Sequence, residues 1–156
     1  MDKQDWRYFL FLLAAHHPKE KLDHTIRLRI AKKEIFLCCR CTGIAFGMAQ
    51  VFGIAILGCL SPSWFFLPLI AALPVAAIVD WFTQSAQKRK SYTWVRLVTG
   101  FFLGNAEALA LVLLFSGFYL EFVVALGMAL TYALSVYLIA HKTKCLDAYV
   151  NEWNRL

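Results

Sequence analysis

Histidine and cysteine residues gather in a short stretch near the start of the sequence. His16, His17 and His24 come first, and Cys38 and Cys41 follow with C-x-x-C spacing. Two thiolates and two imidazoles form a ligand set that suits tetrahedral Zn²⁺. Closely spaced cysteines in a cytoplasmic segment favour metal or redox chemistry over a structural disulfide. The pattern therefore predicts a metal site, with zinc as the expected ion.

Two other interpretations of these residues stay open. Cys41 lies where a helix is expected to begin, and a helix N-terminus stabilises a thiolate, so Cys38 and Cys41 could form a thiol redox pair. Alternatively, the cysteines are small apolar residues at the membrane interface, and His16 and His17 lie at the headgroup boundary. The spacing does not match a standard zinc finger, so it does not choose among the three.

A β-hairpin is expected between the histidines and the C-x-x-C pair. The stretch Thr25–Cys38 contains alternating apolar residues, a charged turn and a second apolar run, which is the pattern of two short strands. Such a hairpin would bring Cys38 and Cys41 back towards the three histidines.

Polar residues inside the later apolar runs form a second candidate group. Asp80 and Gln84 are four residues apart, on one helix face, and Arg96 opens the next run. Ionisable residues at membrane depth are costly and mark a buried pair or a functional site. Asp80 and Arg96 could fasten two helices as an ion pair, or act as a catalytic base and an anion ligand. Asn105 and Glu107 lie deeper, and hydrogen bonds between helices are expected of them, with a cavity-lining role as the alternative.

The composition indicates which elements must position these residues. The chain has 156 residues, of which 60% are hydrophobic and 17% charged, with a net charge of +6 and a mean hydropathy of +0.59. It is too apolar to hide its hydrophobic residues in one small soluble core. A soluble nucleic-acid binder is therefore disfavoured, and a disordered chain is excluded.

Four apolar runs are each about long enough to cross a bilayer, and none alternates with a period of two. All 16 Lys and Arg residues lie before the first run, around the start of the third or after the fourth. The positive-inside rule then places both termini and the central loop in the cytoplasm, in a protein integral to the cell membrane. The predicted spans are Thr42–Leu60, Trp64–Trp81, Val95–Phe115 and Phe118–Ala140.

The predicted fold is an all-α polytopic membrane protein of one domain. It consists of a cytoplasmic or interfacial Cys/His segment (1–41), a four-helix transmembrane bundle (42–140) and a cytoplasmic tail (141–156). The short apolar stretch Trp6–Ala15 is expected to be an interfacial helix, although a signal-peptide core is the alternative.

Two similar openings mark the first and third spans. Thr42–Gly47 and Thr99–Gly104 both read T-G-x-x-x-G, and each follows an arginine. Small residues four apart allow helices to approach closely. We therefore expect these two spans to cross near the cytoplasmic face.

Four strings in this order resemble the membrane proteins grouped as domain-of-unknown-function family 2085. They are HHP…DH, C-x-R-C-T-G-x-x-x-G, D-W-x-T-Q and R-x-x-T-G-x-x-x-G, which together cover His16–Gly104. Many members carry a Cys-His pair where this chain has His16 and His17. The resemblance implies no activity, but it implies one shared site built from His16, His17, His24, Cys38, Cys41, Asp80, Gln84 and Arg96.

Three functions remain in competition. A membrane-embedded zinc enzyme would act on a lipid or isoprenoid phosphate at the inner leaflet, with the basic surface attracting the anion. A closed zinc knuckle would instead brace a protein of transport or assembly, and a thiol redox protein would use the C-x-x-C pair. The expected partner is the lipid bilayer, with an anionic lipid as candidate substrate and no nucleic acid. The oligomeric state stays open, a homo-oligomer included.

Overall fold

The computed structural model describes residues 25–30, 33–85 and 92–142 of the chain. Two strands, β1 (Thr25–Ile30) and β2 (Lys33–Cys38), precede four helices. The helices are α2 (Cys39–Ile56), α3 (Phe66–Ser85), α4 (Thr93–Phe115) and α5 (Tyr119–Lys142). His16, His17, His24, the expected interfacial helix and most of the expected tail lie outside the described residues.

The four helices are long and apolar enough to cross a membrane. They contain 18, 20, 23 and 24 residues, and at a rise of 1.5 Å per residue these lengths correspond to about 27–36 Å. The hydrocarbon core of a bilayer is about 30 Å thick. The predicted all-α class and the four predicted spans are therefore confirmed.

Some helix ends differ from the predicted span ends, because hydrogen bonds and not apolarity determine where a helix stops. The first span was expected over Thr42–Leu60, whereas α2 covers Cys39–Ile56. Gly58 has a φ of +69°, and its N–H donates to the carbonyl of Ala55. A glycine in the left-handed region is a common helix terminator, so the chain leaves the helix while it is still apolar.

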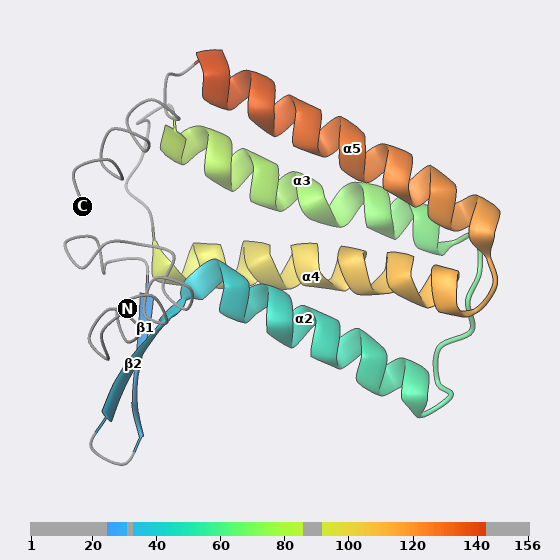
Figure 1. The fold of residues 1–156 in the computed structure, drawn as a ribbon, viewed down its shortest axis with the longest axis horizontal. Coiled ribbons are helices and arrows are strands. Elements are labelled where there is room, and N and C mark those ends of the chain that lie inside the picture. Colours follow the sequence, from blue (N-terminus) through green and yellow to red (C-terminus); the bar gives the residue numbers. More distant parts are fainter. Residues whose placement is uncertain (1–24, 31–32, 86–91, 143–156) are drawn as a thin grey trace, which may run out of the picture.

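The predicted hairpin is present over the same residues. Strands β1 and β2 pair antiparallel, with Thr25 opposite Cys38 and Ile30 opposite Lys33. The second strand leads directly into α2, since β2 ends at Cys38 and α2 begins at Cys39. Figure 1 shows the hairpin at one end of the four helices, where α2 and α4 begin and α3 and α5 end. We call this the hairpin end of the bundle.

Helices α2 and α4 run in the same direction and touch along a row of glycines. A Cβ atom on Gly43 would lie 2.2 Å from the carbonyl oxygen of Leu97, and one on Gly104 would lie 2.2 Å from that of Ile44. Such distances are far inside van der Waals contact, so no other residue fits without moving the helices apart. The expected crossing of these two spans is confirmed. The four contact glycines are Gly43, Gly47, Gly100 and Gly104.

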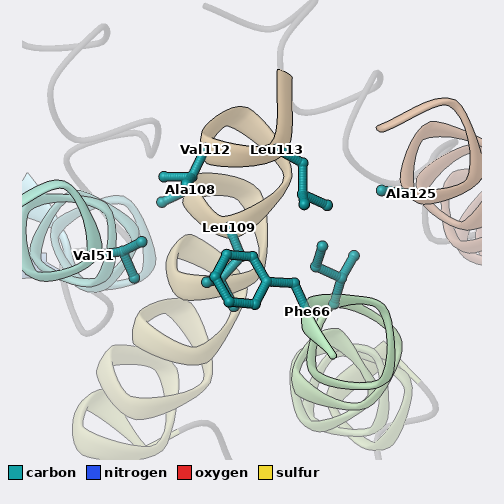
Figure 2. Packing of buried hydrophobic residues seen from close by; sticks show 8 residues of the cluster. Val51, Phe66, Ala108, Leu109, Val112, Leu113 and Ala125 are labelled. Atoms are coloured by element: carbon teal, nitrogen blue, oxygen red, sulfur yellow. The ribbon is translucent and has the colours of Figure 1, made fainter. Parts of the chain in front are cut away.

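A hydrophobic core joins all four helices towards the end away from the hairpin (Figure 2). Val51 of α2, Phe66 of α3, Leu113 of α4 and Ala125 of α5 contribute to it. Helix α4 is central, because it packs against α2, α3 and α5. Helix α5 buries only Ala125 and Ala140 among its described side chains, so most of its apolar surface is left for lipid.

Candidate functional site

Four polar side chains meet at the hairpin end and form what we call the arginine cluster: Arg40, Asp80, Gln84 and Arg96. Arg40 is the second residue of α2, and Arg96 lies in the first turn of α4. Asp80 and Gln84 lie near the end of α3. Because α3 runs opposite to α2 and α4, its last turns and the first turns of α2 and α4 lie at the same end of the bundle (Figure 1).

The close ion pair of the cluster joins Arg40 to Asp80. The Nη2 atom of Arg40 donates to Oδ2 of Asp80 at 2.7 Å, and the Asp80 side chain is only 2% exposed. The sequence pointed to Arg96 as the partner of Asp80 and overlooked Arg40. Arg96 lies within electrostatic reach of the same carboxylate, so both arginines act on Asp80, with Arg40 in direct contact.

Arg96 makes its own contact with α3. Its Nη2 atom donates to Oε1 of Gln84 at 2.6 Å. Gln84 lies one turn after Asp80, as the four-residue spacing predicted, so α3 presents a carboxylate and an amide to two different arginines. The cluster thereby ties α3 to both α2 and α4.

The cluster has hydrogen-bond donors to spare. Nε of Arg40 and Nε2 of Gln84 are buried and have no hydrogen-bond partner among the described residues. A buried donor left unsatisfied costs about 1–3 kcal/mol, and such an atom calls for an acceptor such as a water molecule or an ion. Two arginines and one aspartate also leave the cluster with a net positive charge. An oxyanion would satisfy both the donors and the charge.

Three thiols adjoin the cluster at the junction of β2 and α2. Cys38 and Cys39 are buried, whereas Cys41 is exposed. The Cys41 side chain lies within hydrogen-bonding reach of Cys38, and Cys39 lies within reach of Thr93 at the start of α4. The two thiols of the C-x-x-C pair are therefore neighbours in space as well as in sequence.

The complete zinc ligand set is only partly visible. Within residues 25–30, 33–85 and 92–142, no three His, Cys, Asp or Glu side chains come together as a metal site. Cys38 and Cys41 are described, while the three candidate histidines lie outside. Strand pairing places Thr25 opposite Cys38, and His24 directly precedes Thr25 in the sequence.

An apolar cavity of about 630 Å³ lies between α3, α4 and α5, with Arg40 and Met48 of α2 at its border. Its walls are almost entirely aliphatic and aromatic; the polar residues that line it are Arg40, Glu107 and Tyr132. A volume of this size is typical of ligand sites, which range over about 300–1,000 Å³. The Tyr132 hydroxyl donates to the carbonyl of Ala71 and so joins α5 to α3 beside the cavity.

The two polar residues deep in α4, Asn105 and Glu107, have different surroundings. Asn105 donates from Nδ2 to the carbonyl of Phe101 at 2.7 Å, so its hydrogen bond lies within its own helix and not between helices as expected. Glu107 lines the cavity, which was the alternative expectation for it.

The cavity itself escaped prediction from the sequence. The available signal was a set of alanines that lie one turn apart on facing helices and leave space between them. They include Ala106 and Ala110 of α4 and Ala129 and Ala133 of α5.

Four spanning helices, a polar centre at one end of them and an apolar cavity beside that centre define a polytopic α-helical membrane protein. More specifically, the chain belongs to the family described as "Predicted membrane protein (DUF2085)", whose model matches residues 20–110. The matched range contains the hairpin, the contact glycines and the whole arginine cluster, whereas α5 lies beyond it. Neither a curated protein nor a solved structure matches the chain.

Proposed function

We propose that the protein binds a membrane amphiphile with a phosphate head group, holding the phosphate at the arginine cluster and the chain in the cavity. One observation carries this proposal: Arg40 belongs to both. It is a member of a positively charged cluster with unsatisfied donors, and it also lines the apolar cavity. The proposed phosphate site and the cavity proposed to hold the chain therefore share one residue, Arg40.

The chemistry of the cluster suits a phosphate. Guanidinium groups match phosphate oxygens in geometry and charge. Nε of Arg40 and Nε2 of Gln84 would each gain the acceptor that they lack. Arg96 would supply the second positive charge, which is the anion-holding role expected of it.

The shape of the cavity suits an extended chain. On α3 its lining residues run from Ile70 to Trp81, a distance of roughly 16 Å along the helix axis. An amphiphile in the cytoplasmic leaflet could enter with its head group at the hairpin end and its chain alongside α5. The orientation required is that given by the positive-inside rule.

A metal centre beside the head group would extend binding to catalysis. We infer that Cys38 and Cys41 hold Zn²⁺ together with two of His16, His17 and His24. The contact between the two thiols supports this inference. When bound with an open position, zinc would supply a Lewis acid for a phosphate oxygen. Asp80 would then be the base and Arg96 the anion ligand.

A closed zinc site is the second candidate, and the position of the cysteines favours it. Cys38 ends β2 and Cys41 lies in the first turn of α2. A fully coordinated metal there would lock the hairpin onto the first span, which is a structural role.

Binding of dodecyl phosphate to the purified protein in nanodiscs tests the proposed function. We expect dodecyl phosphate to bind more tightly than both dodecanol and inorganic phosphate. Arg96→Gln should weaken its binding by roughly 10- to 100-fold, because a charged hydrogen bond is lost. Arg27→Gln, in the exposed part of the hairpin, is the matched control and should leave binding unchanged.

Two results would contradict the proposal. Equal binding of dodecanol would mean that the phosphate contributes nothing. Equal binding of inorganic phosphate would mean that the cavity holds no chain and that the anion comes from solution.

A further inference from the structure

Glu107 is an exposed carboxylate on the wall of the cavity, and the proposed function does not use it. It lines the cavity from α4, and among the described residues it has neither a hydrogen-bond nor an ion-pair partner. A charged or polar group at membrane depth without a partner is costly. By contrast, Asp80 is paired with Arg40.

The depth of Glu107 follows from the helix contacts. The carbonyl oxygen of Arg40 lies against Gly100, where an added Cβ would meet it at 2.4 Å. Glu107 is seven residues further along α4, which places it about 10 Å deeper in the membrane. The cavity therefore has a basic group at its hairpin end and an acidic group about 10 Å below.

Among the described residues, the cavity walls around Glu107 are mostly apolar and hold no positive charge close to it. The residues that line the cavity from α3 and α5 are apolar apart from the rings of Trp81 and Tyr132. The Tyr132 hydroxyl already donates to Ala71. The basic residue of the lining, Arg40, donates from Nη2 to Asp80 and lies about 10 Å from the level of Glu107. A donor on the molecule that occupies the cavity would supply the partner that Glu107 lacks among the described residues.

We propose that Glu107 binds a hydrogen-bond-donating group, an amine or a hydroxyl, on the chain of the bound amphiphile. This inference rests on the proposed function and narrows its substrate class. The ligand is an amphiphile with a phosphate at one end and a donor about 10 Å along its chain, in place of a plain alkyl or prenyl phosphate. Mostly apolar sites commonly obtain their specificity from a few such polar groups.

The test compares two probes that differ only in the donor. Octyl phosphate and the same molecule with a terminal amine are titrated against the protein in nanodiscs, with empty nanodiscs as the blank. We expect the wild-type protein to prefer the amine probe by roughly 10- to 100-fold. Glu107→Gln, which keeps the shape of the side chain, should reduce this preference to a few-fold, and Glu107→Leu should abolish it.

The control variant is Glu121→Gln, which alters an acidic residue of α5 that does not line the cavity. It should keep the full preference for the amine probe. Binding of octyl phosphate to both Glu107 variants shows that they are folded.

The outcomes separate this inference from the proposed function. If octyl phosphate binds but the amine brings no preference, the role of Glu107 is wrong and the phosphate site stands. If only the amine probe binds, and Glu107→Gln abolishes its binding while Arg96→Gln leaves it unchanged, the phosphate site is wrong and the Glu107 site stands. If neither probe binds, both proposals are overturned.

Discussion

Arg40 balances the charge of the most deeply buried carboxylate in the described part of the chain. The Asp80 side chain is 2% exposed, whereas that of Arg40 is 23% exposed. Removing the arginine would leave a buried charge without its close partner, which typically costs about 3–5 kcal/mol. We therefore expect Arg40→Met to lower the midpoint of thermal unfolding in detergent strongly.

Replacing both partners should restore much of that loss, since exchanging a buried ion pair for apolar residues is often nearly neutral. The double variant Arg40→Met with Asp80→Leu is expected to unfold at a higher temperature than Arg40→Met alone. A double variant no more stable than the single one would show that the pair is not what Arg40 contributes. Arg27→Met, at the exposed ion pair with Glu34, is the control and should change stability by less than about 1 kcal/mol.

The C-x-x-C thiols provide a second prediction at the residue scale. If Cys38 and Cys41 bind zinc, the purified protein should contain metal in stoichiometric amount, and Cys41→Ser should lose most of it. Cys59→Ser is the matched control, because Cys59 is an exposed cysteine near the opposite end of the bundle. Elemental analysis by mass spectrometry measures this; metal-free wild-type protein with freely titrating thiols would exclude both zinc proposals.

At the scale of elements, the contact between α2 and α4 depends on the absence of side chains. Gly100→Ala would place a methyl group 2.4 Å from the carbonyl oxygen of Arg40, and the helices would have to separate. Overpacking of this kind costs about 1–3 kcal/mol. Gly127→Ala in α5 is the matched control, since a Cβ there meets nothing within 4 Å, and alanine favours a helix by about 1 kcal/mol. Thermal unfolding should show Gly100→Ala destabilised and Gly127→Ala unchanged or stabilised, whereas equal effects would contradict the tight contact.

Much of this arrangement can be read from the sequence, because it depends on spacing along the chain. The hairpin over Thr25–Cys38 follows from alternation, and the α2–α4 crossing follows from two T-G-x-x-x-G openings. The ion-pair partner of Asp80, by contrast, does not follow from spacing along the chain. Arg40 and Arg96 both lie at the hairpin end, so the rotation of α2 and α4 about their axes decides how each arginine approaches the carboxylate. That rotation, like the cavity left between alanine-lined helices, arises from packing and has no local signature.

At the scale of the molecule, the bundle has two unlike ends. The hairpin lies at one end, and the connections from α2 to α3 and from α4 to α5 lie at the other (Figure 1). The thiols and the arginine cluster belong to the hairpin end. The positive-inside rule predicts that the hairpin end faces the cytoplasm. Exposed cysteines near the two ends, Cys41 and Cys59, make this orientation testable.

Single-cysteine variants and a membrane-impermeant maleimide provide the measurement. A variant that keeps only Cys59 should be labelled in intact cells, whereas one that keeps only Cys41 should be labelled only after the cells are opened. The reverse pattern would invert the predicted orientation and would move the proposed phosphate site to the outer leaflet.

The contact between α2 and α4 also has a consequence for how the protein is made. Gly100 is 57 residues after Gly43 in the chain, and ribosomes add about 5–20 residues per second, so it emerges roughly 3–11 s later. During that interval the glycine row of α2 lacks the helix that it contacts in the folded protein. Asp80 emerges well before α4 is complete, so the ion pair with Arg40 is the polar link available to hold the first two spans together. We therefore expect the bundle to assemble from its hairpin end, with α4 packing against α2 next and α5, which is made last, joining after it.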